Sequence, residues 1–335
     1  MSNEKMKTSD FLLSVRDLKV VYTSVGATVH AVNGVSLDIK RGESLGLVGE
    51  TGAGKTTIAK SILGVLPNPP AKILNGEIIL EDSDLLKLPE KEMRKVRGNK
   101  ISMIFQDPMT ALNPLLTVGD QIAEVVSLHE SVSKKEAMNK AMEMLEMVGI
   151  PADRYEEFPH QFSGGMKQRV VIAIALACNP ELLLADEPTT ALDVTIQAQV
   201  MDMISALQKK RNTSMILITH DLGVVAESCD NVAVIYAGQI VEYASKEDLF
   251  LNPVHPYTLG LFGSIPSLTG DVKRLTPIPG MPPDPENLPD GCSFHPRCKY
   301  ATEECKHGSV PFKEVSPNHF VHCHMCHCNK EVLIL

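Results

Sequence analysis

The segment from Gly49 to Thr56 constrains this chain more than any other feature, because it fits the pattern G-x-x-x-x-G-K-[ST] at every position. It follows an apolar run at 44–48 that predicts a buried strand, and it opens a helix predicted at about 55–66. Glycines here let backbone N–H groups turn inward around phosphate oxygens, and the helix start favours an anion. We therefore expect a triphosphate-binding loop, in which Lys55 reaches the β and γ phosphates and Thr56 ligates Mg²⁺. The residues assigned to the nucleotide here are Gly49, Glu50, Thr51, Gly52, Ala53, Gly54, Lys55, Thr56 and Thr57.

A second chemical element is the acidic pair Asp186-Glu187, which ends an apolar run at 181–185. Such a strand delivers Asp186 to the sheet edge beside the phosphate loop, where it can hold Mg²⁺. Glu187 then faces the position of an attacking water. Two adjacent carboxylates repel each other unless a cation or a proton-transfer role separates them, so a solvated acidic turn is the weaker alternative.

The first 245 residues alternate between short apolar runs and helical patterns, which predicts a mixed α/β domain. Ser133 and Glu136 have the spacing of a capping box at the start of one of these helices. The further strands are predicted at 101–105, 214–219 and 231–236, and the further helices at 134–148, 164–178 and 195–211.

Composition changes near residue 246, because twelve of the 22 prolines and seven of the 11 histidines follow it. We predict a disordered tail at 1–10, a nucleotide-binding domain at 11–245 and a small, irregular, Cys-rich domain at 246–335. Little periodicity is left in this last segment, so it is expected to need something other than a hydrophobic core. Six of the eight cysteines lie there, and only Cys178 and Cys229, expected as buried small hydrophobes, precede it.

Charge and hydropathy exclude several classes of protein. The net charge of −9 and a pI of about 5.7 argue against nucleic acid as the main partner, because phosphate backbones favour a basic surface. The longest apolar run, 170–178, is far shorter than the roughly 20 residues of a membrane-spanning helix. The first ten residues have no apolar signal core, so export is not expected.

Six motifs in a fixed order make the chain similar to the ATP-binding cassette (ABC) ATPases, over about residues 11–245. Besides the phosphate loop and the Asp-Glu strand end, these are Gln106 in the position of the Q-loop, the signature segment Ser163-Gly164-Gly165, the D-loop Ala191-Leu192-Asp193 and the switch histidine His220. The resemblance implies a RecA-like core, an antiparallel β subdomain and a helical subdomain at about 107–175.

The resemblance also assigns roles to these residues. Glu187 polarises water, while Gln106 and His220 contact the γ-phosphate region and Gln106 also approaches Mg²⁺. Tyr22 is the candidate for stacking on adenine, although it could equally cover a sheet edge. Ser163, Gly164 and Gly165 start a helix, so they form a second anion-binding surface. In the family, two ATPase subunits pack head to tail and each signature closes over the partner's phosphate loop. Asp193, in the D-loop, is also assigned to nucleotide binding.

The residues within and around these motifs resemble the peptide/nickel importer branch of the ABC ATPases. Residues 106–114, 162–169 and 186–199 carry this likeness, and the segments His255-Pro256-Tyr257-Thr258 and 277–280 extend it into the tail. The stretch from His324 onward matches nothing expected.

The cysteines after residue 290 allow more than one interpretation: a metal site or thiols without a metal. Four thiolates can hold zinc or a [4Fe–4S] cluster, and the wide gaps here weaken zinc. The branch resemblance favours the cluster, with a structural role, and free or regulatory thiols are the third alternative. Cys326 and Cys328 could compete as ligands. The predicted cluster ligands are Cys292, Cys298, Cys305 and Cys323.

We therefore expect an ATP hydrolase subunit that drives peptide import through separate integral membrane permease subunits. It would lie at the cytoplasmic face of the cell membrane as a peripheral protein, with an extracytoplasmic solute-binding protein completing the transporter. A permease helix would dock near the Q-loop, with residues 117–148 as part of the lever. The alternatives are a nickel or other solute importer of the same branch, a non-transport ABC ATPase acting on nucleic acid or ribosomes, and a module that binds ATP without hydrolysing it.

Overall fold

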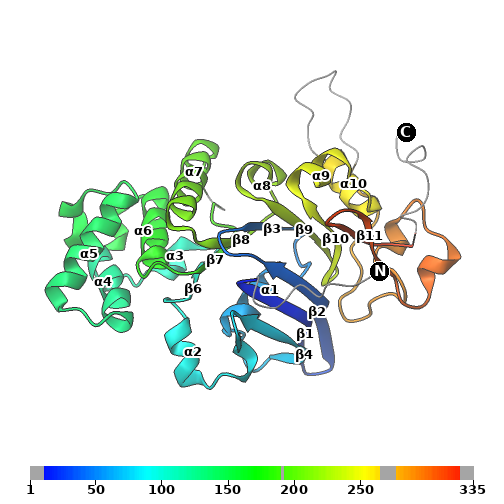
Figure 1. Cartoon of the computed structure of the whole chain (residues 1–335), viewed down its shortest axis with the longest axis horizontal. Helices are drawn as coiled ribbons and strands as arrows, with labels where there is room; N and C mark the ends of the chain where they lie inside the picture. The colour runs from blue at the N-terminus through cyan, green and yellow to red at the C-terminus, as the bar shows by residue number, and fades with distance from the viewer. Residues whose placement is uncertain (1–10, 190–191, 265–276, 325–335) are drawn as a thin grey trace.

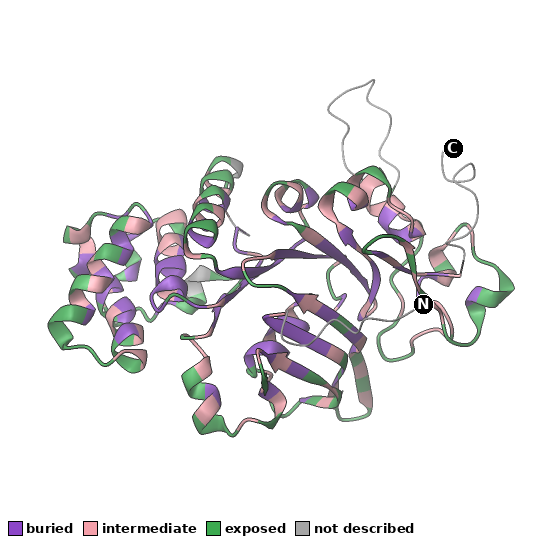
Figure 2. Cartoon of the chain, viewed as in Figure 1, coloured by how far each residue is buried: buried purple, intermediate pink, exposed green. Residues whose placement is uncertain are grey.

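The computed structural model describes residues 11–189, 192–264 and 277–324, and these form two sheets with helices around them (Figure 1). The larger sheet has eight strands in the order β11-β12-β10-β9-β3-β8-β7-β6. Its central strands pair in parallel. They are apolar and almost entirely buried, as strands covered on both faces must be (Figure 2). The five central strands are β3 (Ser44–Val48), β6 (Ile101–Ile104), β7 (Leu182–Asp186), β8 (Ser214–Thr219) and β9 (Asn231–Tyr236).

The smaller sheet is antiparallel, with the order β2-β1-β4-β5. Helix α1 (Lys55–Leu63) lies between the two sheets, and its Ile58 and Ile62 are fully buried in the apolar cluster that joins them. The mixed α/β fold predicted from the sequence is thus confirmed. The strands of this sheet are β1 (Leu13–Ser24), β2 (Ala27–Ile39), β4 (Ala71–Leu80) and β5 (Ser83–Asp84).

A group of helices covers one end of the larger sheet (Figure 1). In α5, the Ser133 side chain accepts the Glu136 N–H while Glu136 accepts the Ser133 N–H, so the predicted capping box is present. The helices before residue 230 are α2 (Glu90–Val96), α3 (Pro108–Ala111), α4 (Val118–His129), α5 (Lys134–Met147), η2 (Leu85–Lys87), η3 (Ala152–Glu156), η4 (Pro159–Gln161), α6 (Gly164–Leu176), α7 (Val194–Arg211) and α8 (Leu222–Ser228).

The C-terminal segment does not form the separate Cys-rich domain predicted from its composition. Its strand β12 pairs with β10 of the larger sheet, with Glu242 opposite Val321, so the segment extends the core sheet. Its aromatic residues Tyr257 and Phe294 belong to the same buried apolar cluster as Tyr236 of β9. A shared core therefore holds it, which composition alone does not reveal. The elements are β10 (Gln239–Ser245), α9 (Lys246–Leu251), α10 (Pro256–Gly263), η5 (His295–Arg297), η6 (Glu303–Lys306), β11 (Phe312–Ser316) and β12 (His319–His322).

Within the described ranges, the structure contains no helix of sufficient length and apolar character to span a bilayer. The tail predicted at 1–10, Ala191 of the predicted D-loop, and the residues Cys326 and Cys328 lie outside those ranges.

Candidate functional site

The predicted nucleotide residues follow the carboxyl ends of neighbouring parallel strands. The phosphate loop follows β3, His220 follows β8, the acidic pair ends β7, and Gln106 lies two residues after β6. Carboxyl ends of parallel strands meet at one edge of a sheet, where ligands bind in open α/β folds. The strand order β3-β8-β7-β6 therefore brings these groups to one place.

The phosphate loop is packed tightly enough that two of its positions require glycine. A Cβ at Gly49 would lie 2.1 Å from the Ile235 carbonyl oxygen, and a Cβ at Gly54 would lie 2.3 Å from that of Ala31. Both glycines also have positive φ, 155° and 100°. The loop backbone is thus fixed by strand β9 and the second sheet before any nucleotide arrives.

Lys55 and Thr56 occupy the first turn of α1, beside the end of β7. The buried Lys55 ammonium donates to the carbonyls of Gly49, at 2.7 Å, and Glu50, at 3.0 Å. Burial lowers the pKa of Lys55, although three nearby carboxylates, led by Glu187, oppose this shift. Thr56 Oγ1 donates to Asp186 Oδ1 at 3.0 Å.

Asp186 is 2% exposed, and this burial raises the pKa of its carboxyl group. Its hydrogen bond with Thr56 acts in the opposite direction, while the neighbouring Glu187 raises the pKa further. A buried carboxylate and a hydroxyl in contact are hard oxygen ligands, so this pair fits Mg²⁺.

Glu187 is held from two sides. Gln106 Nε2 donates to Glu187 Oε2 at 2.8 Å, and His220 Nδ1 lies 3.4 Å from Oε1. Glu187 itself has a left-handed backbone, with φ of 46°, and its N–H donates to the Ile218 carbonyl. Strained backbone is often found at active sites, and two polar side chains orient this carboxylate. Glu187 is therefore a candidate catalytic residue.

Two further residues predicted to bind nucleotide are Tyr22 and Asp193. The hydroxyl groups of Tyr22, on β1, and Thr57, on α1, are 3.3 Å apart, so the predicted adenine-stacking residue is next to the phosphate-loop helix. Asp193 is instead the N-cap of α7, where its side chain accepts the Ile196 N–H at 3.0 Å.

The signature segment forms the start of α6. Ser163 is its N-cap and accepts the Met166 N–H at 3.4 Å. Ser163 and Gly164 are exposed, and Gly165 is half-buried. The first N–H groups of this 13-residue helix therefore point to an open surface, which suits an anion.

The C-terminal segment reaches the phosphate loop, which was not predicted from the sequence. Tyr257 and Arg297 both bind Glu50, the second residue of the loop. The short motifs that contain them are visible in the sequence, but nothing local shows that their partner lies 207 or 247 residues away.

The predicted iron–sulfur site is not supported. All four proposed ligands lie in the described part of the chain, where no group of three or more His, Cys, Asp or Glu side chains is arranged to hold a metal. Burial raises the pKa of the Cys292 and Cys298 thiols. Cys305 and Cys323 are buried.

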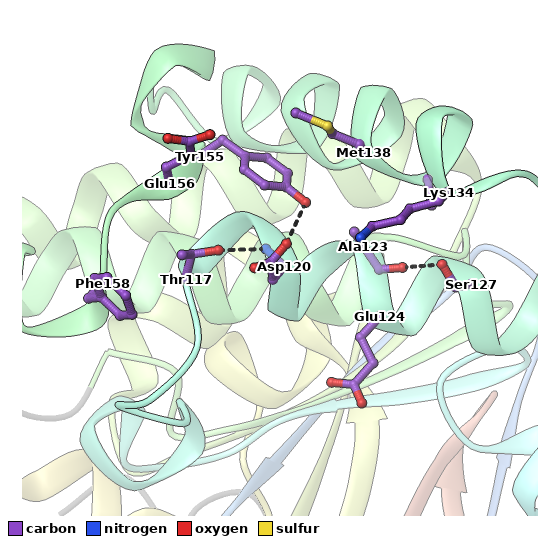
Figure 3. A pocket seen from close by; sticks show the side chains of 11 residues that line it. Thr117, Asp120, Ala123, Glu124, Ser127, Lys134, Met138, Tyr155, Glu156 and Phe158 are labelled. Carbon is purple, nitrogen blue, oxygen red and sulfur yellow. Dashed lines mark hydrogen bonds between the residues drawn. The ribbon is translucent and has the colours of Figure 1, made fainter.

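A hollow of about 690 Å³ lies among α4, α5 and the segment 155–158 (Figure 3). The Tyr155 hydroxyl donates to Asp120 at 3.0 Å, and burial together with Asp120 raises the pKa of Tyr155 to about 12, so this hydroxyl stays protonated. The lining side chains are Thr117, Asp120, Ala123, Glu124, Ser127, Lys134, Ala137, Met138, Tyr155, Glu156 and Phe158.

Two family models match the chain. Residues 32–190 match "ABC transporter", and residues 241–305 match "Oligopeptide/dipeptide transporter, C-terminal region".

Curated relatives are similar over almost their full length. The dipeptide transport ATP-binding protein DppD of Bacillus subtilis is 51% identical over 314 residues, which cover 93% of this chain and 94% of the relative. The oligopeptide transport ATP-binding protein OppD of Escherichia coli is 46% identical over 317 residues, covering 94% and 93%.

Solved structures share the fold of the first part of the chain. The dimeric ATP-binding cassette MJ0796 in a post-hydrolysis state with ADP and Pi gives a TM-score of 0.63 at 28% identity, covering 70% of this chain and 98% of that one. CbiO1 of Clostridium perfringens, part of an ABC transporter complex, gives 0.62 at 28% identity, covering 72% and 92%.

Proposed function

The chain belongs to the ATP-binding subunits of oligopeptide/dipeptide ABC transporters, and we propose that it binds and hydrolyses MgATP to drive peptide import through a separate membrane permease. One observation carries the site assignment. Thr56, on the phosphate-loop helix, is hydrogen-bonded to Asp186 at the end of β7. The adjacent Glu187 contacts Gln106 and His220, which follow β6 and β8. The match of the C-terminal region supports peptide rather than nickel or another solute as cargo.

In this proposal Lys55 and the loop N–H groups bind the phosphates, and Tyr22 stacks on the adenine. Thr56 and Asp186 hold Mg²⁺, with Gln106 close by. When bound, Mg²⁺ neutralises charge on the phosphate oxygens. The energetic contribution of these groups is positioning and charge stabilisation rather than covalent chemistry.

Glu187 accepts a proton from the attacking water, or polarises it, as general base. Gln106 and His220 each contact one of its carboxylate oxygens and so fix the orientation of the carboxylate. A positioned base of this kind contributes about 10²–10⁴-fold to a rate.

The signature face acts in a dimer. We propose that Ser163, Gly164 and Gly165 close over the nucleotide of a second ATPase subunit, identical or related, packed head to tail. The exposed start of α6 supports this role, and the similar cassette MJ0796 is described as dimeric with ADP and Pi bound.

The hollow between α4 and α5 is the proposed permease-docking groove. Its rim includes the carboxylates of Asp120, Glu124 and Glu156, with Lys134 as a lining cation (Figure 3). Its lining also includes Phe158, an exposed apolar side chain. A short amphipathic permease helix with basic residues fits this combination. Docking there would hold the subunit at the cytoplasmic membrane face, with a solute-binding protein delivering peptide from the other side.

The test compares Glu187→Gln with the wild-type chain. We expect MgATP binding to persist and phosphate release to fall at least 100-fold, because only the base is removed. Glu146→Gln, on the exposed face of α5, serves as the matched control and should hydrolyse normally. Undiminished hydrolysis in Glu187→Gln would remove Glu187 from this role. Uptake of labelled dipeptide and of nickel, compared in cells with and without the chain, distinguishes the two cargoes.

A further inference from the structure

Glu50 is the residue of the phosphate loop that the C-terminal segment holds. Its backbone N–H donates to the Tyr257 hydroxyl at 2.9 Å. Its carboxylate accepts two hydrogen bonds from Arg297, at 2.8 Å from Nη1 and 3.1 Å from Nη2. Its carbonyl accepts from Lys55. Every polar group of Glu50 therefore has a partner, and two of these three groups, the N–H and the carboxylate, have their partners beyond residue 250.

Arg297 is itself fixed in place. Its side chain is 5% exposed, and Nε donates to the Pro279 carbonyl at 3.0 Å. Nη1 also donates to the Tyr236 hydroxyl at 3.3 Å, and the guanidinium lies 6.0 Å from the Phe294 ring centroid. A guanidinium held this way loses little freedom on pairing, and its two parallel hydrogen bonds fix the geometry of the carboxylate.

The carboxylate of Glu50 lies in the loop that receives a polyanion. An unneutralised charge there would repel the nucleotide phosphates, and burial would strengthen that repulsion. Arg297 supplies the compensating charge from the side of the loop packed against the C-terminal segment. If Arg297 were removed, a partly buried and unpaired carboxylate would be left beside the phosphate site.

We propose that Arg297 is a positioning residue for nucleotide binding: it neutralises Glu50 and, together with Tyr257, holds the start of the phosphate loop in the conformation that receives the triphosphate. This inference rests on the proposed ATP function. It gives the C-terminal segment a role in the ATP site, since affinity for nucleotide depends on how that segment is packed.

The test is a double-mutant cycle on the full chain, read as the dissociation constant of a fluorescent ATP analogue with Mg²⁺. Arg297→Met, which keeps the apolar stem, should weaken binding about tenfold by leaving Glu50 charged and unpaired. Glu50→Gln is the second single variant of the cycle, and its own affinity is the reference for the double variant. In the double variant the loss should disappear, because no charge is left to neutralise. Arg41→Met serves as a control, since Arg41 also pairs with carboxylates but precedes β3, at the opposite edge of the sheet.

The cycle separates electrostatic positioning from simple structural support. If Arg297→Met costs the same affinity in the wild-type chain and in the Glu50→Gln background, the effect is one of packing and the proposal is overturned. Wild-type affinity in Arg297→Met would overturn it as well. If Arg297→Met fails to fold, Arg297→Lys provides the same comparison, with a smaller loss that Glu50→Gln again suppresses. Failure of the wild-type chain to bind MgATP would instead overturn the proposed function.

Discussion

The phosphate-loop face and the signature face of this subunit are built in opposite ways. Around the phosphate loop, the charged side chains Lys55 and Asp186 are buried and hydrogen-bonded, Lys55 to backbone carbonyls and Asp186 to the Thr56 hydroxyl. At the signature, Ser163 and Gly164 are exposed and uncharged, and the helix start offers only backbone N–H groups. The first face is assembled within one chain, whereas the proposed function makes the second one half of a site shared by two subunits.

This difference means that nucleotide binding and turnover should respond separately to mutation. Changes at the phosphate loop alter the affinity of a single subunit. Changes at the signature alter only what happens after two subunits close, because the charge it meets belongs to the partner's nucleotide.

The largest effect is expected for Lys55→Met. This change removes the buried ammonium but keeps an apolar side chain of similar length. Loss of charge-assisted hydrogen bonds to phosphate, each about 1.5–3 kcal/mol, predicts a fall in MgATP affinity of about 100-fold. Equilibrium binding to the single subunit measures it.

Lys60→Met, on the same helix, is the control and should retain affinity within a few-fold. Lys60 lies in the last turn of α1 and acts on the site through its charge, which lowers the pKa of Asp186. Similar losses in both variants would mean that Lys55 acts through the net charge of the helix rather than by contact. The contrast between the two faces would then have no basis.

A smaller and more selective effect is expected for Gly164→Ala. A Cβ at Gly164 would come no nearer than 4.0 Å to Leu192, so the subunit should fold normally. The methyl group would project where the partner's phosphates approach the helix start. We expect turnover at saturating ATP to fall roughly tenfold with unchanged single-subunit affinity, since one set of transition-state donors is pushed away.

Gly165→Ala sharpens this prediction. There a Cβ would lie 2.8 Å from Ile196 Cγ2, so thermal stability should fall as well as turnover. Melting temperature, phosphate release and affinity, measured together, separate the two variants. If Gly164→Ala also weakened nucleotide binding to the single subunit, the signature face would not be acting in trans.

The central strands of the larger sheet and the nucleotide edge could be predicted because their signals are local. Strand β3 and helix α1 flank a motif that fits at every position, and the apolar runs of β7 and β8 match the observed strands within a residue. Parallel strands then bring their carboxyl ends together by geometry alone. Such features need no knowledge of distant partners.

The C-terminal segment could not be predicted in the same way. Its cysteines dominate the local pattern and predict a domain held by a metal. The segment is instead held by aromatic packing around Tyr236 and Phe294, whose ring centroids are 5.2 Å apart, and by the ion pair between Arg297 and Glu50. Those contacts join residues far apart in sequence, so they leave no periodicity and no spacing to detect.

The smallest effect tests whether burying a charge lowers folding stability at the phosphate-loop face, which would be a cost that the uncharged signature face does not have. Burial raises the pKa of Asp186, so its folded carboxyl holds a proton more tightly than the unfolded one. Keeping it ionised at neutral pH therefore costs stability, and this cost disappears as the pH falls below the unfolded pKa.

Asp186→Asn can keep the Thr56 hydrogen bond without the charge. In the absence of nucleotide it should be about 1 kcal/mol more stable at pH 7, roughly 2–4 °C in melting temperature, with the advantage shrinking in acid. MgATP, which stabilises the wild type, should stabilise this variant less. A variant less stable than wild type at pH 7 would show that the buried carboxylate is already well compensated, and that the two faces differ in exposure alone.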